Sequence, residues 1–347
     1  MRGQRAGAAL SKERTMLRYI GQRFLQFLLI IWIANSLTFL LPRLIPGDPV
    51  QEAMQVKAAA AGNQNFDIQA WVKTYTELFG LGQPLWKQYL NYWWDLIHLD
   101  FGYSLFDYPA TVMSMIVAAI PWTIGFMSVA IVLAFVVGTA LGALLAWPNS
   151  PRFIQGLVPV LMVISAIPFY LFGLALIWIF AVELRWLPPG GAYDPTLILR
   201  PDWKTAWNII QHAILPASAL VLFGVGTWAL GMRATMVNIL GEDFITFAQA
   251  KGLPERRIFM NYGVRNALLP QITGLAISFG LILGSGVIIE AIFSYPGIGS
   301  LIFRAINAKD YFVTNGTVAI MVVTAASALL IVDLIYPLID PRIRFSK

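Results

Sequence analysis

Long apolar runs without a charged side chain constrain this sequence more than any other feature. The hydrocarbon core of a bilayer is about 30 Å thick, so a helix that crosses it needs roughly 20 mostly apolar residues. Because 58% of the residues are hydrophobic and only 12% are charged, we expect an all-α polytopic membrane protein with six transmembrane helices. The runs are continuous, unlike the alternating strands of a membrane barrel. They lie at residues 24–41, 108–151, 153–182, 205–232, 266–289 and 311–332.

The first apolar run could be mistaken for a cleaved signal peptide, because Arg14, Arg18 and Arg23 precede it. Its 18 uncharged residues exceed the usual apolar core of about 7 to 15 residues, and no small-x-small cleavage site follows. We therefore expect it to be retained as the first transmembrane helix.

The distribution of basic residues predicts which side of the membrane each loop faces. Lys and Arg in short loops favour the cytoplasmic side, and here they gather in the N-terminal tail, in the fourth loop and after the last run. We therefore expect both termini to be cytoplasmic. The predicted order is a tail at 1–18, a first transmembrane helix at 19–42, an extracytoplasmic region at 43–115, a five-helix core at 116–340 with a cytoplasmic loop at 234–266, and a tail at 341–347.

The net charge of +6 belongs mainly to the inner face in this topology. A basic inner face favours contact with the anionic lipid of the bilayer. It gives no reason to expect nucleic acid binding.

The region between the first two runs is too long for a simple connection, so we expect it to fold. Its stretch KQYLNYWWDLIHLDFG is rich in Trp and Tyr. Such side chains could stack on a sugar or another solute, but they also suit an amphipathic helix in the membrane interface, where aromatic residues concentrate.

Several kinds of chemistry have no residues to carry them. The chain contains no cysteine, which excludes disulfides and thiolate sites. His98 and His212 lack a second ligand at metal-binding spacing, and no Gly-Lys pair of a phosphate-binding loop occurs. We expect no catalytic residue, metal or cofactor on this chain, so any ATP that drives it must be hydrolysed by another polypeptide.

A transporter driven by protons or sodium would need ionisable residues deep within its spans. Asp333, toward the inner end of the last run, is the one clear exception to nearly charge-free spans. It could line a path, pair with a basic residue of a partner, or lie near the interface as a capping carboxylate. Glu290 looks like an anchor for the following loop, SYPGIG.

The segment FAQAKGLPERRIFMNYGVRNALLP, at residues 247–270, lies between two apolar runs. Glu242 and Asp243 can cap or charge-stabilise a helix over FITFAQAK. Gly252 can adopt the left-handed conformation that ends a helix, and Pro254 fits the first position of a second helix, PERRIFMNYGV. The sequence thus predicts two short helices joined by a glycine break.

One face of the first short helix is suited to docking. Phe244, Phe247, Ala248 and Lys251 follow the i, i+3, i+4, i+7 spacing, which places them on one side. A basic amphipathic connector lying on the lipid surface would show the same local pattern, so both interpretations remain open at this point.

The spacing from Thr246 through Gly252 to Leu269-Pro270 resembles the cytoplasmic "EAA loop" of binding-protein-dependent ABC importers. Further segments are similar to the first permease subunit of dipeptide, oligopeptide and nickel importers, and the resemblance covers nearly the whole chain. These segments are MLRYIGQRFLQFLLIIWIANSLTFLLPRLIPGDP, LGQPLWKQYLNYWWDLIHLDFGYSL, VIIEAIFSYPGIGSLIFRAINAKDY and VDLIYPLIDPRIR.

The resemblance implies the type I ABC importer permease fold in a bacterial-type inner membrane. It also implies a second homologous permease, an extracytoplasmic solute-binding protein and two ATPase subunits that hold ATP and Mg. The loop would supply a coupling helix that inserts into a cleft of an ATPase. Its coupling residues would be Phe244, Thr246, Phe247, Ala248, Lys251, Gly252, Leu253, Arg256 and Pro270.

One departure limits this transfer. Thr246-Phe247-Ala248 stands where the motif has Glu-Ala-Ala, so a salt bridge from a motif glutamate to the ATPase is not expected. Peptide-type permeases commonly show such a variant, and the resemblance favours peptides as solutes. Oligosaccharides and nickel complexes remain alternatives.

Alternating access would require helices that slide or rock. Glycines at 138, 142, 224, 231, 280, 284 and 286 could permit such sliding, or could simply allow close packing. The residues we expect to line a translocation path are Ser165, Pro168, Tyr170, Ser278, Ser285 and Asp333.

Overall fold

The computed structural model describes residues 2–44, 49–61, 68–78 and 80–339. Within these ranges every regular element is a helix, apart from one isolated β-bridge between Tyr103 and Thr111. The chain forms two compact units, one of Met1–Ala118 with Leu301–Lys347 and one of Ala119–Ser300. The predicted all-α architecture is confirmed for the described residues, while the predicted tail at 341–347 lies outside them.

In the described part of the chain, four helices are long and apolar enough to cross a membrane: α1 (Arg2–Leu44), α5 (Val112–Ala146), α9 (Trp203–Leu240) and α16 (Tyr311–Ile339). They correspond to the first, second, fourth and sixth predicted runs. The spans predicted at these runs are therefore present as continuous helices.

The third predicted run is a bent pair of helical segments. The two segments, Arg152–Ala166 and Phe169–Glu183, meet at an angle of 92°. Pro168 causes the break, because its ring disfavours a helical conformation at Ile167, which is extended at φ −81° and ψ 126°. The four elements concerned are α6 (Arg152–Gln155), α7 (Leu157–Ala166), α8 (Phe169–Leu176) and η1 (Ile177–Glu183).

The fifth predicted run is divided among three helices, α12 (Arg265–Gly280), α13 (Ile282–Ser285) and α14 (Val287–Ile292). The breaks fall at Leu281 and Gly286, next to glycines that favour helix less than other residues. The described residues thus contain four continuous helices that could cross a membrane, or five spans if the bent pair is counted as one. The predicted continuous helix at 266–289 is thus wrong in detail.

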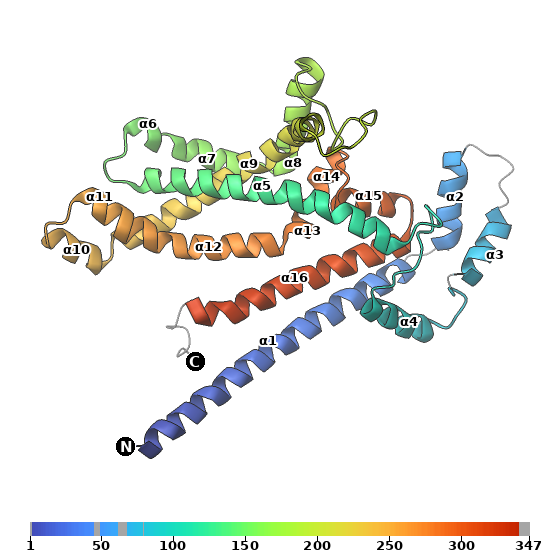
Figure 1. The fold of residues 1–347 in the computed structure, drawn as a ribbon, viewed down its shortest axis with the longest axis horizontal. Coiled ribbons are helices and arrows are strands. Elements are labelled where there is room, and N and C mark those ends of the chain that lie inside the picture. Colours follow the sequence, from blue (N-terminus) through green and yellow to red (C-terminus); the bar gives the residue numbers. More distant parts are fainter. Residues whose placement is uncertain (1, 45–48, 62–67, 79, 340–347) are drawn as a thin grey trace. The chain divides into compact units, whose positions relative to one another are not determined.

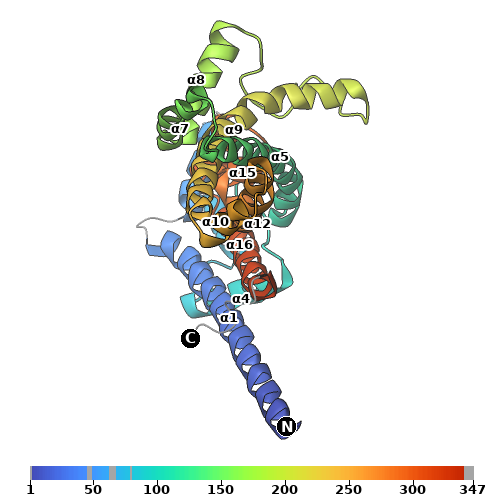
Figure 2. The ribbon, with the colours of Figure 1, turned by 90° about the vertical axis from the view of Figure 1, so that its left-hand side faces the viewer.

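In the unit that holds both termini, α1 and α16 lie side by side (Figures 1 and 2). They run antiparallel, since Arg23 contacts Asp333 while Phe39 and Phe312 line one cavity at the other end. The amino end of α1 and the carboxyl end of α16 therefore share one side of this unit.

The predicted folding of the region after α1 is confirmed for its described residues. Val50 and Met54 of α2 (Pro49–Ala61) form a core with Tyr75 of α3 (Ile68–Leu78). The aromatic stretch forms a helix as expected, α4 (Leu85–His98).

The other unit is built around α9, against which α7, α8 and α12 pack. α5 meets α9 almost backbone to backbone: a Cβ on Gly138 would lie only 2.6 Å from the Cβ of Trp228, and one on Gly142 would clash with the Ala229 carbonyl. These two glycines therefore serve close helix packing, which accounts for them without a sliding role.

The loop that follows α14 is anchored by Glu290, as predicted. Its carboxylate accepts a hydrogen bond from the backbone N–H of Gly299 at 2.7 Å, and its carbonyl accepts one from the Ser300 hydroxyl at 2.8 Å. The Glu290 side chain is fully buried. The loop leads into α15 (Ile298–Asn307).

Candidate coupling loop

A short helix, α10 (Asp243–Ala250), follows the end of α9 after a two-residue turn. Glu242 occupies the N-cap position with extended backbone angles, but its side chain makes no capping hydrogen bond. Asp243 lies in the first turn, where a negative charge complements the helix dipole. Of the two predicted roles, charge stabilisation by Asp243 fits this geometry and side-chain capping by Glu242 does not.

The end of α10 is a Schellman turn, the hydrogen-bonded motif that closes many helices on a glycine. Gly252 has φ +72°, which confirms its predicted left-handed conformation. Its N–H donates to the Gln249 carbonyl at 2.8 Å, and the Leu253 N–H donates to the Ala248 carbonyl at 3.3 Å. The side chain of Leu253 also packs on the cluster that contains Ala248, so Leu253 fixes the break from both backbone and side chain.

The second helical segment starts one residue later than predicted. Pro254 is the N-cap, with φ −64° and ψ 139°, and α11 (Glu255–Arg257) begins after it. The helix continues as η2 (Ile258–Val264) into α12. The extended ψ of Pro254 keeps it outside the helix, although its fixed φ is still suited to helix entry.

One side of α10 is buried within the loop. Ile245, Ala248 and Ile258 form a cluster at 3%, 4% and 5% exposure, against which Leu240 and Tyr262 pack. The prediction that Ala248 belongs to the exposed docking face is therefore wrong, because this methyl group fills the space between α10 and η2. The spacing of four residues from Phe244 places Ala248 near the apolar face, but this spacing alone does not indicate which residues cover Ala248.

The other side of α10 is exposed and apolar. The side chain of Phe247 is 68% exposed and that of Phe244 is 40% exposed. Thr246, Lys251 and Arg256 are also exposed. Large apolar side chains left open to solvent on a short helix are typical of a docking surface.

The loop is tied to the helices on which it rests. The ring of Phe259 stacks on Trp147, with centroids 5.0 Å apart and planes at 18°. Phe259 also belongs to a buried cluster with Met232, Met236 and Ala267. This cluster joins η2 to α5, α9 and α12.

A polar contact adds to this attachment, since Asn149 donates a hydrogen bond to the Glu255 carboxylate. The sequence did not single out either residue, because they are 106 positions apart and no local pattern links them. Pro270, the last predicted coupling residue, lies inside α12 and is exposed, away from the break.

The predicted path residues of this unit lie on the two interrupted apolar segments, α7 with α8 and α12 with α13. Ser165, Pro168 and Tyr170 surround the bend between α7 and α8, and the Ser165 side chain lies against α9, where a Cβ on Gly226 would approach it to 3.2 Å. Ser278 and Ser285 donate their hydroxyl hydrogens to carbonyls of their own helices.

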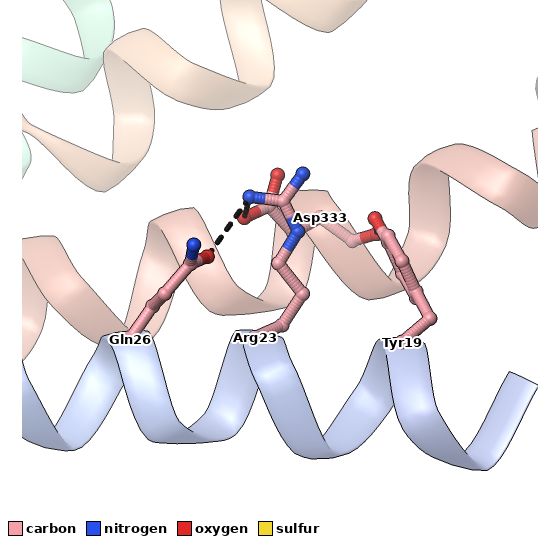
Figure 3. Close-up of polar contacts among 4 residues, drawn as sticks. All are labelled: Tyr19, Arg23, Gln26 and Asp333. Carbon is pink, nitrogen blue, oxygen red and sulfur yellow. Dashed lines mark hydrogen bonds and ion pairs between the residues drawn. The ribbon is translucent and has the colours of Figure 1, made fainter. Parts of the chain in front are cut away.

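Asp333 lies in the other unit, and its partner is on this chain. Its carboxylate is 3.3 Å from the Arg23 guanidinium, with the two side chains 39% and 36% exposed. Figure 3 shows Arg23 and Asp333 pointing toward one another. Tyr19 donates a further hydrogen bond to the Asp333 carbonyl at 2.9 Å. The charge of Asp333 is thus accounted for by α1, so pairing with another subunit is not needed to explain it.

The family model of the binding-protein-dependent transport system inner membrane component matches residues 138–345, which include the whole loop. The oligopeptide transport system permease protein AppB of Bacillus subtilis (strain 168) is 32% identical over 333 residues, covering 95% of this chain and 100% of that protein.

Two further relatives give the same result. The di/tripeptide transport system permease protein DppB of Pseudomonas aeruginosa (strain UCBPP-PA14) is 31% identical, covering 96% of this chain and 100% of that protein. The dipeptide transport system permease protein DppB of Escherichia coli (strain K12) is 30% identical, covering 90% of this chain and 94% of that protein. This chain belongs to the family of inner membrane components of binding-protein-dependent transport systems.

Proposed function

We propose that this chain is the permease subunit of an ATP-driven importer of di- and oligopeptides, and that it forms half of the translocation path. The solute class is supported by the names of the relatives, which are oligopeptide, dipeptide and di/tripeptide permeases. The path would be completed by a second homologous permease, and an extracytoplasmic binding protein would deliver the peptide.

The observation that carries the proposal is the exposed pair Phe244 and Phe247 on a helix whose end is fixed by the Schellman turn. An apolar face on a short, well-anchored helix can insert into a cleft of a partner protein. We assign that cleft to an ATPase subunit, which would bind ATP and Mg. Lys251 and Arg256 would lie beside this contact and favour an acidic rim on the partner.

In this assembly, closure of the ATPases on ATP would displace α10, and the displacement would reach α12 through Leu253 and the Phe259 cluster. The membrane helices would then alternate between outward and inward openings. Ser165, Pro168 and Tyr170, at the bend of the third span, and Ser278 and Ser285 are the candidates for lining the path.

The proposed topology has six spans, the third bent and the fifth broken, with both termini and the loop 234–266 in the cytoplasm. The antiparallel α1 and α16 support termini on one side. The basic N-terminal tail supports the cytoplasmic side. The extracytoplasmic region would then include α2, α3 and α4.

The absence of native cysteine makes a crosslinking test direct. A single cysteine at Phe247 in the full importer should form a crosslink to an ATPase subunit with a short bifunctional reagent. A cysteine at Gln249, also exposed but on another side of α10, is the matched control and should react far less. Equal crosslinking at both positions, or none at Phe247, would contradict docking through this face.

Transport and topology need separate measurements. Proteoliposomes with the complete importer should accumulate a labelled dipeptide when ATP reaches the ATPases, and should ignore a proton gradient. A membrane-impermeant maleimide should label a cysteine introduced at Lys12 from the cytoplasmic side only. Labelling from outside would reverse the proposed topology, and uptake that follows the proton gradient without ATP would rule out the proposed energy source.

A further inference from the structure

A cavity of about 330 Å³ lies in the unit formed by the two ends of the chain. It is near the lower end of the roughly 300–1,000 Å³ typical of ligand pockets. Its walls are the last turns of α1, one face of α4, the first turns of α16, and the segments just before and after α4. Its lining includes the polar side chains of Arg43, Gln88, Asp95 and Asn315.

Arg43 brings a positive charge to this cavity, and no carboxylate of the described residues pairs with it. Its Nη1 donates to the Phe39 carbonyl at 2.7 Å, and its Nε and Nη2 donate to Gln88 Oε1 at 3.3 and 3.1 Å. The guanidinium also lies over the Phe39 ring, 3.6 Å from its centroid. Because a guanidinium has five N–H groups, two donors remain for a ligand, and neither ion pair found among the described residues involves Arg43.

The same cavity contains acceptors that are suited to a cation. Asp95 makes no ion pair in the described part of the chain. Asn315 Oδ1 is buried and has no hydrogen-bond partner there. A buried acceptor without a donor costs free energy of desolvation that a ligand N–H would recover. The cavity thus offers donors to an anion and acceptors to an ammonium group.

Burial shifts the pKa values of both charged groups toward their neutral forms. It lowers the pKa of Arg43 to about 10, although Tyr92 nearby acts in the opposite direction. Burial, and then the charge of Asp100, raise the pKa of Asp95. Arg43 remains charged at neutral pH, and a bound anion would offset the cost of burying it.

α4, which borders the cavity, has one polar face and one apolar face. Gln88, Asn91, Tyr92 and Asp95 follow the i, i+3, i+4, i+7 spacing, and this face lines the cavity. The opposite surface carries apolar side chains that are more than half exposed. They are Trp86, Leu90, Trp94 and Ile97.

A helix with its polar face toward the protein and an apolar, Trp-bearing face turned outward is suited to the membrane interface. Acyl chains can lie along such a face while a headgroup enters the adjacent polar cavity. A free peptide also carries an ammonium and an anionic group, but it would gain nothing from the exposed apolar face of α4.

We propose that this cavity binds the zwitterionic headgroup of an aminophospholipid. Arg43 donates to the phosphate, and Asp95 and Asn315 Oδ1 accept hydrogen bonds from the primary ammonium. The bound lipid would connect the end of α1 to α4 and to the start of α16. This inference does not depend on the solute that the importer carries.

Two headgroups test the site, using the intact importer purified in mild detergent and lipid titration followed by native mass spectrometry. Phosphatidylethanolamine has an ammonium with N–H donors, whereas phosphatidylcholine has the same phosphate but no N–H. Asp95→Asn should weaken phosphatidylethanolamine binding about tenfold, as expected for the loss of a hydrogen bond to a charged group. It should weaken phosphatidylcholine binding less, because that headgroup keeps its positive charge but has no N–H to donate.

Arg43→Gln should weaken the binding of both lipids, since both present a phosphate. The matched controls are Glu77→Gln and Lys87→Gln, which remove exposed charges outside the cavity and should change neither. A selective effect of Asp95→Asn cannot arise from misfolding, because misfolding would affect both lipids. Equal loss of both lipids in Asp95→Asn, no change in either variant, or displacement of phosphatidylethanolamine by a short peptide would overturn the proposal.

Discussion

Leu253 is fastened to Ala248 twice, by a hydrogen bond of 3.3 Å from its backbone N–H to the Ala248 carbonyl and by packing of its side chain in the same buried cluster. Gly252, the residue before Leu253, adopts the left-handed backbone conformation. The angle between α10 and the following helix is therefore set by Ala248, Gly252 and Leu253. We expect a turn fixed in this way to pass a displacement of α10 on to η2.

Replacing Gly252 by alanine should strain this turn. A Cβ at φ +72° costs about 1–2 kcal/mol, while the space around it is open, with nothing within 4 Å. We expect Gly252→Ala to lower the ATP hydrolysis that is stimulated by loaded binding protein, with normal membrane insertion. Gly241→Ala is the control, because Gly241 has φ −86° in the same loop and should be neutral. Equal activity of both variants would show that the turn is not required.

Enlarging Ala248 should separate α10 from η2. Ala248→Leu adds volume to a site that is 4% exposed, and such overpacking typically costs about 1–3 kcal/mol. We expect a lower thermal unfolding temperature and weaker ATPase assembly. Thr246→Leu, at an exposed position two residues away, should leave the unfolding temperature nearly unchanged. A larger drop in unfolding temperature for Thr246→Leu than for Ala248→Leu would contradict the buried position of Ala248.

The sequence predicted the local features of this loop well, because they depend on neighbouring residues. A glycine followed by an apolar residue ends α10, and Pro254 starts the next helix within one position of the prediction. Contacts between residues that are distant in the sequence could not be predicted in this way. Nothing near Ala248 indicates that Ile258 covers it, and nothing near Glu255 indicates Asn149. The bend in the third span has a local cause in Pro168. The length of the apolar run nevertheless predicted one continuous helix there.

The ion pair between Arg23 and Asp333 should behave as a coupled pair. Both side chains are more than a third exposed, so the interaction is expected to contribute roughly 0.2–1 kcal/mol. Arg23→Gln and Asp333→Asn should each lower thermal stability in detergent, and the double variant should lose less than the sum of the two. Strict additivity in this double-mutant cycle would show that the contact contributes nothing.

The N-terminus of α9 should lose its cap in acid. Asp202 accepts a hydrogen bond from the Thr205 N–H at 2.8 Å, and this bond, with a second from the Thr205 side chain, lowers the pKa of Asp202. Because the folded pKa is below the unfolded value of about 3.9, the stabilisation is complete above that pH and is lost as pH falls through the folded pKa.

Hydrogen exchange of the first turn of α9, corrected for intrinsic rates, should therefore rise at low pH. Asp202→Asn keeps a capping side chain that does not titrate, so this variant should remove the pH dependence while preserving protection at pH 7. A pH dependence that persists in Asp202→Asn would assign it to another group.

Coupling through the exposed face of α10 is tested most directly by the ATP hydrolysis of the reconstituted importer in the presence of loaded binding protein. Phe247→Asp places a charge on the 68% exposed side chain position, and Gln249→Asp places the same charge on another exposed side of the helix. We predict that Phe247→Asp lowers the stimulated rate of ATP hydrolysis at least tenfold, which corresponds to about 1.4 kcal/mol. Gln249→Asp should retain the stimulated rate. Full stimulation in Phe247→Asp would contradict docking of this helix on the ATPase.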